Sequence, residues 1–361
     1  MKTELESCLE IIFGLESTPK QREEAIQKKN TLIPPKLYKY RNLTNNALNN
    51  LKTKTLWFDS PHNMNDPYDC RFSVQSLANA ACSIELFNAL FQDLSQDLKN
   101  NYINRLKTEK ILVGELLHDK SLMNGQPDFE STMKLIQAIE DISHKSMVDN
   151  LQKTIHFCSL SSNFESMLMW THYCNEHKGF CIEYDFSALQ FDDHYIKNIF
   201  PVKYNEVLFD LTPYFPNDIE KLKDIELFKK NKKTTLLNPP EHKRLFTLNP
   251  IFQKDINWTY EKEWRVIDLQ SKLEKGSSLG SPNPSAILLG SKFFEQFDVD
   301  VRNRDLNYLG TLSLAFDLLS FCKNNNLEIK LMKNDPQKFK MISEIVSYDA
   351  CKKKLIDLKN K

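Results

Sequence analysis

Two glutamates separated by one residue stand at the front of an apolar run in the segment Tyr260–Ile267, which reads YEKEWRVI. If a strand begins at Tyr260, Glu261 and Glu263 point to one face and Lys262 points to the other. Like charges on one face repel, so the pair costs stability on its own. Such a pair is useful where a carboxylate transfers a proton, binds a hydroxyl group or stabilises a developing cation. The segment indicates an enzyme, and we assign Glu263 and Glu261 to the catalytic set, with Glu263 further into the strand in the main catalytic role and Glu261 at the rim. The alternative is a solvated surface on which these acids form weak ion pairs.

Basic side chains that could hold an anionic ligand occur at two places in the chain. Lys39 and Arg41 alternate with Tyr38 and Tyr40, as expected for a strand with a basic face and an aromatic face. The guanidinium of Arg41 has the two-pronged donor geometry that suits phosphate or carboxylate. We assign Arg41 to the catalytic set and Lys39 and Tyr40 to ligand binding, and Arg265 also to ligand binding. The alternative for the first cluster is an exposed edge with two solvated cations.

The segment Asn65–Cys70, which reads NDPYDC, is typical of a turn in which Asn and Asp side chains bond their own backbone. The turn explains Asn65 and Pro67 well. Asp66 and Asp69 could also bind ligand hydroxyls or a cation, and both are predicted as ligand-binding residues.

A serine-rich stretch and an aromatic helix follow in the middle of the chain. Ser159 and Ser161 lie where a predicted strand becomes a turn, a position from which hydroxyl groups can face a ligand. Trp170 and Tyr173 are three residues apart, so they share a helical face and could stack on a planar ring. His172 completes the predicted ligand-binding set. Packing of Trp170 and a hydrogen-bonded structural role for His172 are the alternatives, and no metal site is predicted.

The composition excludes several classes of protein. The 361 residues carry 48 basic and 48 acidic side chains, so the net charge gives no support for nucleic-acid binding, although a local basic patch stays open. No apolar run is long enough for a membrane span, and the N-terminus does not look like a signal peptide. Eight cysteines without a CxxC pair favour a reduced, cytoplasmic protein. GxGxxG and Walker A loops are both absent, so a nucleotide would be held in another way.

These residues must be positioned by strands that are spread along the chain and separated by helices of uneven length. That order predicts an α+β fold with an irregular central sheet, mixed or antiparallel, and a helical insertion. Strands are predicted over 37–41, 55–59, 154–160, 179–184, 202–204, 286–290 and 327–331. Helices are predicted over 42–51, 167–175, 217–235 and 309–322, with Thr44 as a candidate cap of the first. We expect a helical extension over 1–33, a main domain over 34–335 and a basic tail over 336–361, which is solvated from Lys352. The insertion, over about 83–153 with two to four helices, could be a lid or a dimer surface. Residues 236–250 and 276–284 are predicted loops.

Taken in order, the tryptophan- and tyrosine-centred blocks resemble the bacterial DUF2971 family. The resemblance rests on LYKYR at 37–41, NDPYD at 65–69, CSLS at 158–161, LMWTHY at 168–173, GFCIEY at 179–184 and WTYEKEWR at 258–265. It covers about residues 36–335. The family carries no settled activity, and a role in phage defence is suspected for its members.

A second resemblance is to ADP-ribosyltransferases of the arginine, Ser-x-Ser, Glu-x-Glu type. Arg41, Ser159-Leu160-Ser161 and Glu261-Lys262-Glu263 follow one another in that order. The resemblance implies that NAD is a substrate, with no tightly bound cofactor. Arg41 would clamp the pyrophosphate, Ser159 would support the nicotinamide side, and Glu263 would hold a ribose hydroxyl and stabilise the cation that forms as nicotinamide leaves. Leucine replaces the usual threonine between the serines, and the motifs are widely spaced.

Two other functions stay open from the sequence. A metal-dependent hydrolase or nuclease would use Asp66, Asp69, Glu183 and Glu261 to hold Mg²⁺. A non-enzymatic sensor, or a protein that binds a protein partner or a second copy of itself, would use the tryptophans for packing or as an interface anchor. An enzyme would instead act on a small molecule or nucleotide.

Overall fold

The computed structural model describes residues 3–92, 94–123, 129–190, 193–214, 241–268, 276–300 and 304–360. The predicted helix over 217–235 and the first part of the predicted loop over 236–250 lie outside these residues. Residues 241–252 belong to a 3-10 segment, η4 (Glu241–Phe252). Among the described residues, no helix is both long and apolar enough to cross a bilayer.

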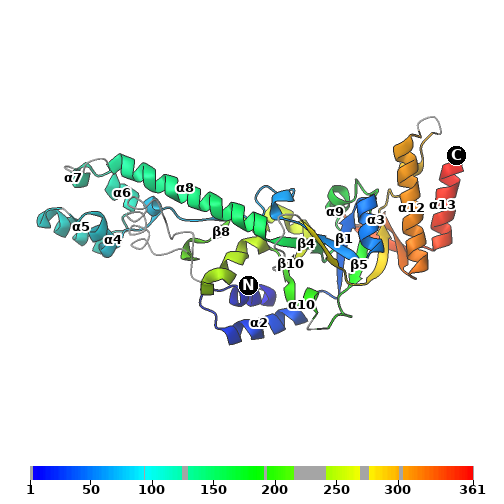
Figure 1. Cartoon of the computed structure of the whole chain (residues 1–361), viewed down its shortest axis with the longest axis horizontal. Helices are drawn as coiled ribbons and strands as arrows, with labels where there is room; N and C mark the ends of the chain where they lie inside the picture. Colours follow the sequence, from blue (N-terminus) through cyan, green and yellow to red (C-terminus); the bar gives the residue numbers. More distant parts are fainter. Residues whose placement is uncertain are drawn as a thin grey trace.

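An eight-stranded mixed sheet forms the centre of the α+β fold, as predicted (Figure 1). Its strands are antiparallel neighbours except for one parallel pair, β12 with β13. In spatial order they are β14 (Met341–Ile345), β13 (Glu328–Asn334), β12 (Pro284–Leu289), β5 (Phe180–Asp185), β1 (Lys36–Arg41), β4 (His156–Ser161), β10 (Glu263–Asp268) and β6 (Ile199–Pro201).

One face of the sheet is covered by helices that bury a large apolar cluster. The helices on this face are α3 (Asn45–Lys52), α10 (His194–Asn198), α12 (Leu306–Asn324) and α13 (Tyr348–Asn360). Thr44 caps α3, as predicted, because its hydroxyl accepts the N–H of Ala47. The predicted tail is part of the fold, because β14 pairs with β13 and α13 buries Cys351 and Leu355 in the cluster. The lysines at 352–354 are exposed, as predicted.

The opposite face carries two separate apolar clusters. The first surrounds Tyr38, Tyr40 and Trp170 and includes α9 (Met167–Tyr173). The second joins Phe157, Phe200 and Ile267 to the N-terminal helices α1 (Glu4–Ile12) and α2 (Pro19–Thr31). The strands between these clusters carry polar side chains on this face, which is where a site can form.

The predicted insertion is a helical arm that extends away from the sheet (Figure 1). Among the described residues it holds five helices rather than two to four: α4 (Ile84–Leu90), α5 (Gln96–Thr108), α6 (Val113–Leu117), α7 (Lys120–Met123) and α8 (Phe129–Thr154). Its outer part has an apolar cluster of its own. The last turns of α8 lead directly into β4, so the arm is joined to the strand that carries both serines.

Three short strand pairs form separate two-stranded sheets beside the central sheet. They are β2 (Thr55–Phe58) with β11 (Ser277–Gly280), β3 (Phe72–Ser73) with β8 (Phe209–Asp210), and β7 (Lys203–Asn205) with β9 (Gln253–Asp255). The first pair corrects the loop predicted over 276–284, because β11 pairs with β2 along its whole length.

Candidate functional site

The three motifs singled out in the sequence lie on three adjacent strands. Arg41 is on β1, Ser159 and Ser161 are on β4, and Glu263 begins β10. Ser161 is directly opposite both Tyr38 and Glu263 in the sheet, so these three side chains share one face. The fold therefore brings together blocks that are about a hundred residues apart in the chain.

A pocket of about 230 Å³ opens where β1 separates from β4. These strands share a single register pair, Tyr38 with Ser161, whereas β1 pairs with β5 along its whole length. The ammonium of Lys39 enters the gap and donates to the carbonyl of Ser159 at 2.7 Å. Phe157 bonds the backbone of Asp59 through both its N–H and its C=O. Because alternate residues point their backbone groups to the same side, the N–H of Ser159 is directed into the gap as well.

Most of the predicted site residues line this pocket. From the predicted set, the lining includes Lys39, Tyr40, Arg41, Asp69, Ser159, Ser161, Tyr173, Glu261 and Glu263. Other lining residues, which were not among the predicted site residues, are Tyr38, Trp57, Asp59, Met64, Asn65, Phe157, Leu160, Met169 and Lys254.

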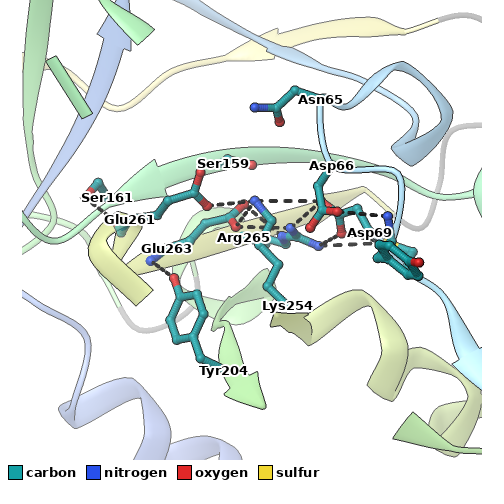
Figure 2. A network of polar contacts seen from close by, with 12 residues as sticks. Asn65, Asp66, Asp69, Ser159, Ser161, Tyr204, Lys254, Glu261, Glu263 and Arg265 are labelled. Carbon is teal, nitrogen blue, oxygen red and sulfur yellow. Dashed lines mark hydrogen bonds and ion pairs between the residues drawn. The ribbon is translucent and has the colours of Figure 1, made fainter. Parts of the chain in front are cut away.

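A buried network of charges forms the floor of the pocket (Figure 2). The guanidinium of Arg265 donates to both carboxylate oxygens of Asp69, at 2.7 and 2.8 Å, and to both oxygens of Glu263, at 2.8 and 3.1 Å. The ammonium of Lys254 lies 2.7 Å from Glu261, 3.3 Å from Glu263 and 3.9 Å from Asp69. Three acids thus surround two cations, and all five side chains are buried.

The two glutamates have opposite electrostatic environments. Burial raises the pKa of Glu261, and the negative charge of Glu263 adds to that effect. Burial would also raise the pKa of Glu263, but the charges of Arg265 and Lys254 outweigh it and hold that pKa below its ordinary value. One acid is therefore poised to exchange a proton, while the other stays ionised. This division is common where two neighbouring acids take different catalytic roles.

The surroundings of Glu261 explain how its carboxylate is oriented. The hydroxyl of Tyr173, on α9, donates to Glu261 at 2.5 Å, and the amide of Asn65 donates to the same hydroxyl oxygen at 3.2 Å. Ser161 donates to the backbone carbonyl of Glu261 at 2.6 Å, so its hydroxyl supports the chain there. The carboxylate faces the pocket although the residue is only 4% exposed, which corrects its predicted place at an open rim.

The local backbone also differs from the prediction around these acids. Glu261 ends a 3-10 segment, η5 (Ile256–Glu261), and the strand begins at Glu263. Lys262 between them has φ of 42° and ψ of 51°, in the left-handed region. Because of this turn, Glu261 and Glu263 are not alternate residues of one strand. They meet because both carboxylates approach the ammonium of Lys254.

Arg41 differs from the other cations of the site. Lys39 is engaged by a carbonyl, and Lys254 and Arg265 are engaged by carboxylates. Within the part of the chain that the structure describes, the guanidinium of Arg41 has no hydrogen bond or ion pair, although it lines the pocket and is half-buried. Its five donors are available to an anionic ligand.

Four predicted ligand-binding residues lie outside the pocket lining. Trp170 is fully buried, packs edge-on against Tyr40 and donates to the carbonyl of Phe164, so it is a core residue. His172 is exposed beside Tyr260 on the outer side of α9. Arg265 is completely buried beneath the acids and orients them, which explains why it does not face the ligand space.

Asp66 is the fourth of these residues. One of its carboxylate oxygens accepts the N–H of Tyr68 at 2.8 Å, as expected for the turn alternative, and the residue is buried. It therefore shapes the loop that carries Asn65 and Asp69 into the pocket.

Two residues that organise the site were not predicted from the sequence. Lys254 is the only lysine of β9 and lies between Gln253 and Asp255, so only its burial among acids marks its role. Tyr204, on β7, accepts the backbone N–H of Glu263 through its hydroxyl at 2.8 Å and so fixes the start of β10. Neither residue belongs to a motif, so long-range contacts alone reveal them.

The metal-dependent alternative required at least three of Asp66, Asp69, Glu183 and Glu261 around one point. Glu183 is held elsewhere by the ammonium groups of Lys36 and Lys330, at 2.6 and 3.1 Å. Where Asp69 and Glu261 do converge, the ammonium of Lys254 already occupies the position of a cation. The described residues contain no cluster of three or more His, Cys, Asp or Glu side chains suited to a metal ion.

Comparison with known proteins gives one match. The family model described as "Protein of unknown function (DUF2971)" matches residues 169–266, which confirms the first resemblance over that segment. The matched segment contains Tyr173, Lys254, Glu261 and Glu263. No curated protein and no solved structure matches the chain.

Proposed function

We propose that this protein consumes NAD by breaking the bond between nicotinamide and ribose, as an ADP-ribosyltransferase or an NAD glycohydrolase. The supporting observation is that Arg41, Ser159 and Glu263, from three adjacent strands, line one pocket. Three short motifs in the right order arise easily by chance in a sequence. Their convergence on one pocket is a separate and more demanding condition.

Arg41 suits the anionic part of the substrate. A pocket of about 230 Å³ is smaller than the roughly 300–1,000 Å³ of typical ligand sites. The nicotinamide and its ribose would enter the pocket and the pyrophosphate would stay at the mouth, where the guanidinium of Arg41 can bind it bidentately. Tyr38, Tyr40 and Tyr173 supply aromatic surface for the nicotinamide ring.

Glu263 suits the positive charge that develops as nicotinamide leaves. A carboxylate whose pKa is lowered stays ionised, so it can stabilise a cation without first losing a proton. Arg265 and Tyr204 hold the side chain and backbone of this residue in place, so little reorganisation is needed during the reaction.

Release of nicotinamide from NAD by the purified protein tests the proposal. Arg41→Lys keeps the charge but loses the bidentate fork, so we expect KM for NAD to rise about tenfold or more. Glu263→Gln removes the fixed anion, and kcat should fall by about 10²–10³-fold. Arg71→Lys and Glu206→Gln, at exposed positions, are matched controls and should behave like the wild type. Absence of nicotinamide release, or full activity in Glu263→Gln, would overturn the proposal.

The biological setting is also part of the proposal. The DUF2971 resemblance suggests a phage-defence effector, in which loss of NAD would arrest an infected cell. The eight cysteines all lie in the described residues and form no disulfide, which fits a reducing compartment such as the cytoplasm. Cellular NAD measured during phage infection, with the wild type and with Arg41→Lys, tests this setting.

A further inference from the structure

Trp57, on β2, presents an exposed indole at the pocket. Along this strand, Leu56 and Phe58 are buried in the large apolar cluster on the helical face of the sheet. Trp57 and Asp59 alternate with them and line the pocket instead. Trp57 is 41% exposed, and a single exposed apolar side chain is ordinary on a protein surface. What distinguishes Trp57 is that its ring is held in one orientation.

A hydrogen bond and a glycine fix the indole. Its Nε1–H donates to a carboxylate oxygen of Asp59 at 3.2 Å. Asp59 is held in turn, because its other oxygen accepts the N–H of Ser60 and the side-chain amide of Asn63, both at 2.8 Å. Gly276, next to β11, lies so close that a Cβ at this position would come within 2.3 Å of the ring. The ring therefore rests against backbone, and little ordering would be needed when a flat ligand binds to it.

Trp57 and Arg41 line the same pocket, where β1 separates from β4. Asp59 bonds the backbone of β4, so the end of β2 lies beside the gap that β1 leaves. Glu261 and Glu263, in contrast, are 4% and 5% exposed and form the buried part of the lining. A substrate that extends from these acids past Arg41 towards solvent would reach the exposed part of the lining, to which Trp57 belongs.

In NAD, the adenosine is joined to the side of the pyrophosphate that faces away from the nicotinamide ribose. Its adenine base is planar and uncharged, so it suits an indole ring rather than a charged side chain. Stacking of one base on an aromatic side chain strengthens binding by roughly 5- to 150-fold. The interaction needs the face of the ring, which an exposed and immobile indole offers.

We infer that Trp57 binds the adenine base of the substrate, so that the pocket selects a dinucleotide over nicotinamide mononucleotide. The inference rests on the proposed function and places the half of NAD that Arg41, Ser159 and Glu263 leave unassigned. Trp57 is a binding residue and takes no part in breaking the bond to nicotinamide. Its removal should therefore affect the dinucleotide and spare the mononucleotide.

Nicotinamide release by the full-length protein, from NAD and from nicotinamide mononucleotide, tests the inference. The mononucleotide keeps the reacting bond, its ribose and one phosphate, but it lacks adenosine. The wild type should have the higher kcat/KM with NAD. Trp57→Leu keeps apolar bulk without a ring, so it should lower kcat/KM for NAD by about 5- to 150-fold and leave that for the mononucleotide unchanged. Trp57→Phe keeps a ring and should recover most of the loss.

A control and a second readout make the test decisive. Phe339→Leu removes a fully exposed aromatic ring outside the pocket lining and should change neither rate. ADP-ribose should quench the fluorescence of Trp57 in the wild type, and Trp57→Phe should lose that quenching. Quenching that persists in Trp57→Phe would overturn the inference, as would equal losses with both substrates in Trp57→Leu or a wild type that uses both equally well. If the wild type releases nicotinamide from neither substrate, the proposed function itself fails.

Discussion

The ammonium of Lys254 occupies the point at which the carboxylates of Asp69, Glu261 and Glu263 converge. A divalent metal could neutralise such a cluster, but here a side chain of the protein does so. A buried ion group of this kind contributes little net stability, because its charges lose their hydration. The ion group instead holds the acids at fixed positions. Glu263 is kept ionised because its pKa is lowered, whereas the pKa of Glu261 is raised. At the scale of single residues, burial of these charges lowers the stability of the fold but fixes the orientation of the acids.

Among the charged residues of the buried network, Arg265 should matter most for the stability of the fold. Arg265→Met leaves Asp69 and Glu263 buried without their main partner, so the free energy of unfolding should fall by about 3–5 kcal/mol in urea titrations at pH 7. The lowered pKa of Glu263 stabilises the fold above its unfolded pKa of about 4.3, and this contribution is lost as pH falls towards the folded pKa. The difference between wild type and variant should therefore shrink below about pH 4.

A matched exposed arginine serves as the control. Arg105 pairs with Glu109 one helical turn away on the surface of α5. Arg105→Met should change the free energy of unfolding by no more than about 0.5 kcal/mol. Equal losses in the two variants would show that Arg265 does not offset the buried charges of Asp69 and Glu263.

At the scale of elements, the junction of η5 and β10 decides how the two glutamates meet. The apolar run that follows the two acids predicted a strand from Tyr260, but Lys262 adopts a left-handed conformation that ends η5 before β10 begins. Such a conformation costs a non-glycine residue roughly 1–2 kcal/mol, so the surrounding contacts must impose it. The hydroxyl of Ser161, bonded to the carbonyl of Glu261, and the carbonyl of Lys262, bonded to the N–H of Ser162, are such contacts.

Substitution of Lys262 measures this strain. A β-branched side chain fits the left-handed region worst and glycine fits it best, so Lys262→Val should be less stable than Lys262→Gly by about 1–2 kcal/mol in urea titrations. At the exposed Glu206, whose φ is not positive, the same pair provides the control. There the glycine variant should be the less stable one, because glycine loses more backbone entropy on folding. The same order at both positions would contradict the strain at Lys262.

The sequence allowed the elements to be predicted better than the site. Alternating or continuous apolar runs identify β1, β4, β5, β12 and β13, and the cap at Thr44 marks the start of α3, because these signals are local. The structure adds the separation of β1 from β4 after one pair and the burial of Lys254, which depend on contacts distant in the chain. Trp170 shows the converse: its helical spacing matches a stacking platform, but tertiary packing places it in the core.

At the scale of the whole molecule, the polar site occupies a strip between two apolar clusters on one face of the sheet. The cluster at Tyr38 and Trp170 belongs to the main domain, whereas the cluster at Phe157 and Phe200 includes the N-terminal helices α1 and α2. The helical arm extends from the same region in another direction (Figure 1). The side chain of Gln152, near the end of α8, donates to the carbonyl of Asp69 at 3.3 Å, so the arm also contacts the pocket loop.

Lys29 connects the N-terminal helices to the sheet and makes that connection sensitive to pH. It is fully buried, donates to the carbonyls of Ile196 and Ile199 at 2.8 and 2.9 Å, and lies over the ring of Phe200. Burial lowers its pKa from 10.5 to about 7. Above pH 7 the folded state therefore binds fewer protons at Lys29 than the unfolded state does, and stability rises with pH until the unfolded lysine also loses its proton.

The variant Lys29→Met should lack this rise. The stability of the wild type relative to the variant should increase between about pH 7 and pH 9, by at most about 1.4 kcal/mol per pH unit, in urea titrations at several pH values. Lys20→Met, at an exposed position of α2, is the matched control and should run parallel to the wild type. A parallel curve for Lys29→Met as well would mean that Lys29 stays charged in the folded protein. The two carbonyls and the ring of Phe200 would then hold a full positive charge, and the N-terminal helices would stay docked without regard to pH.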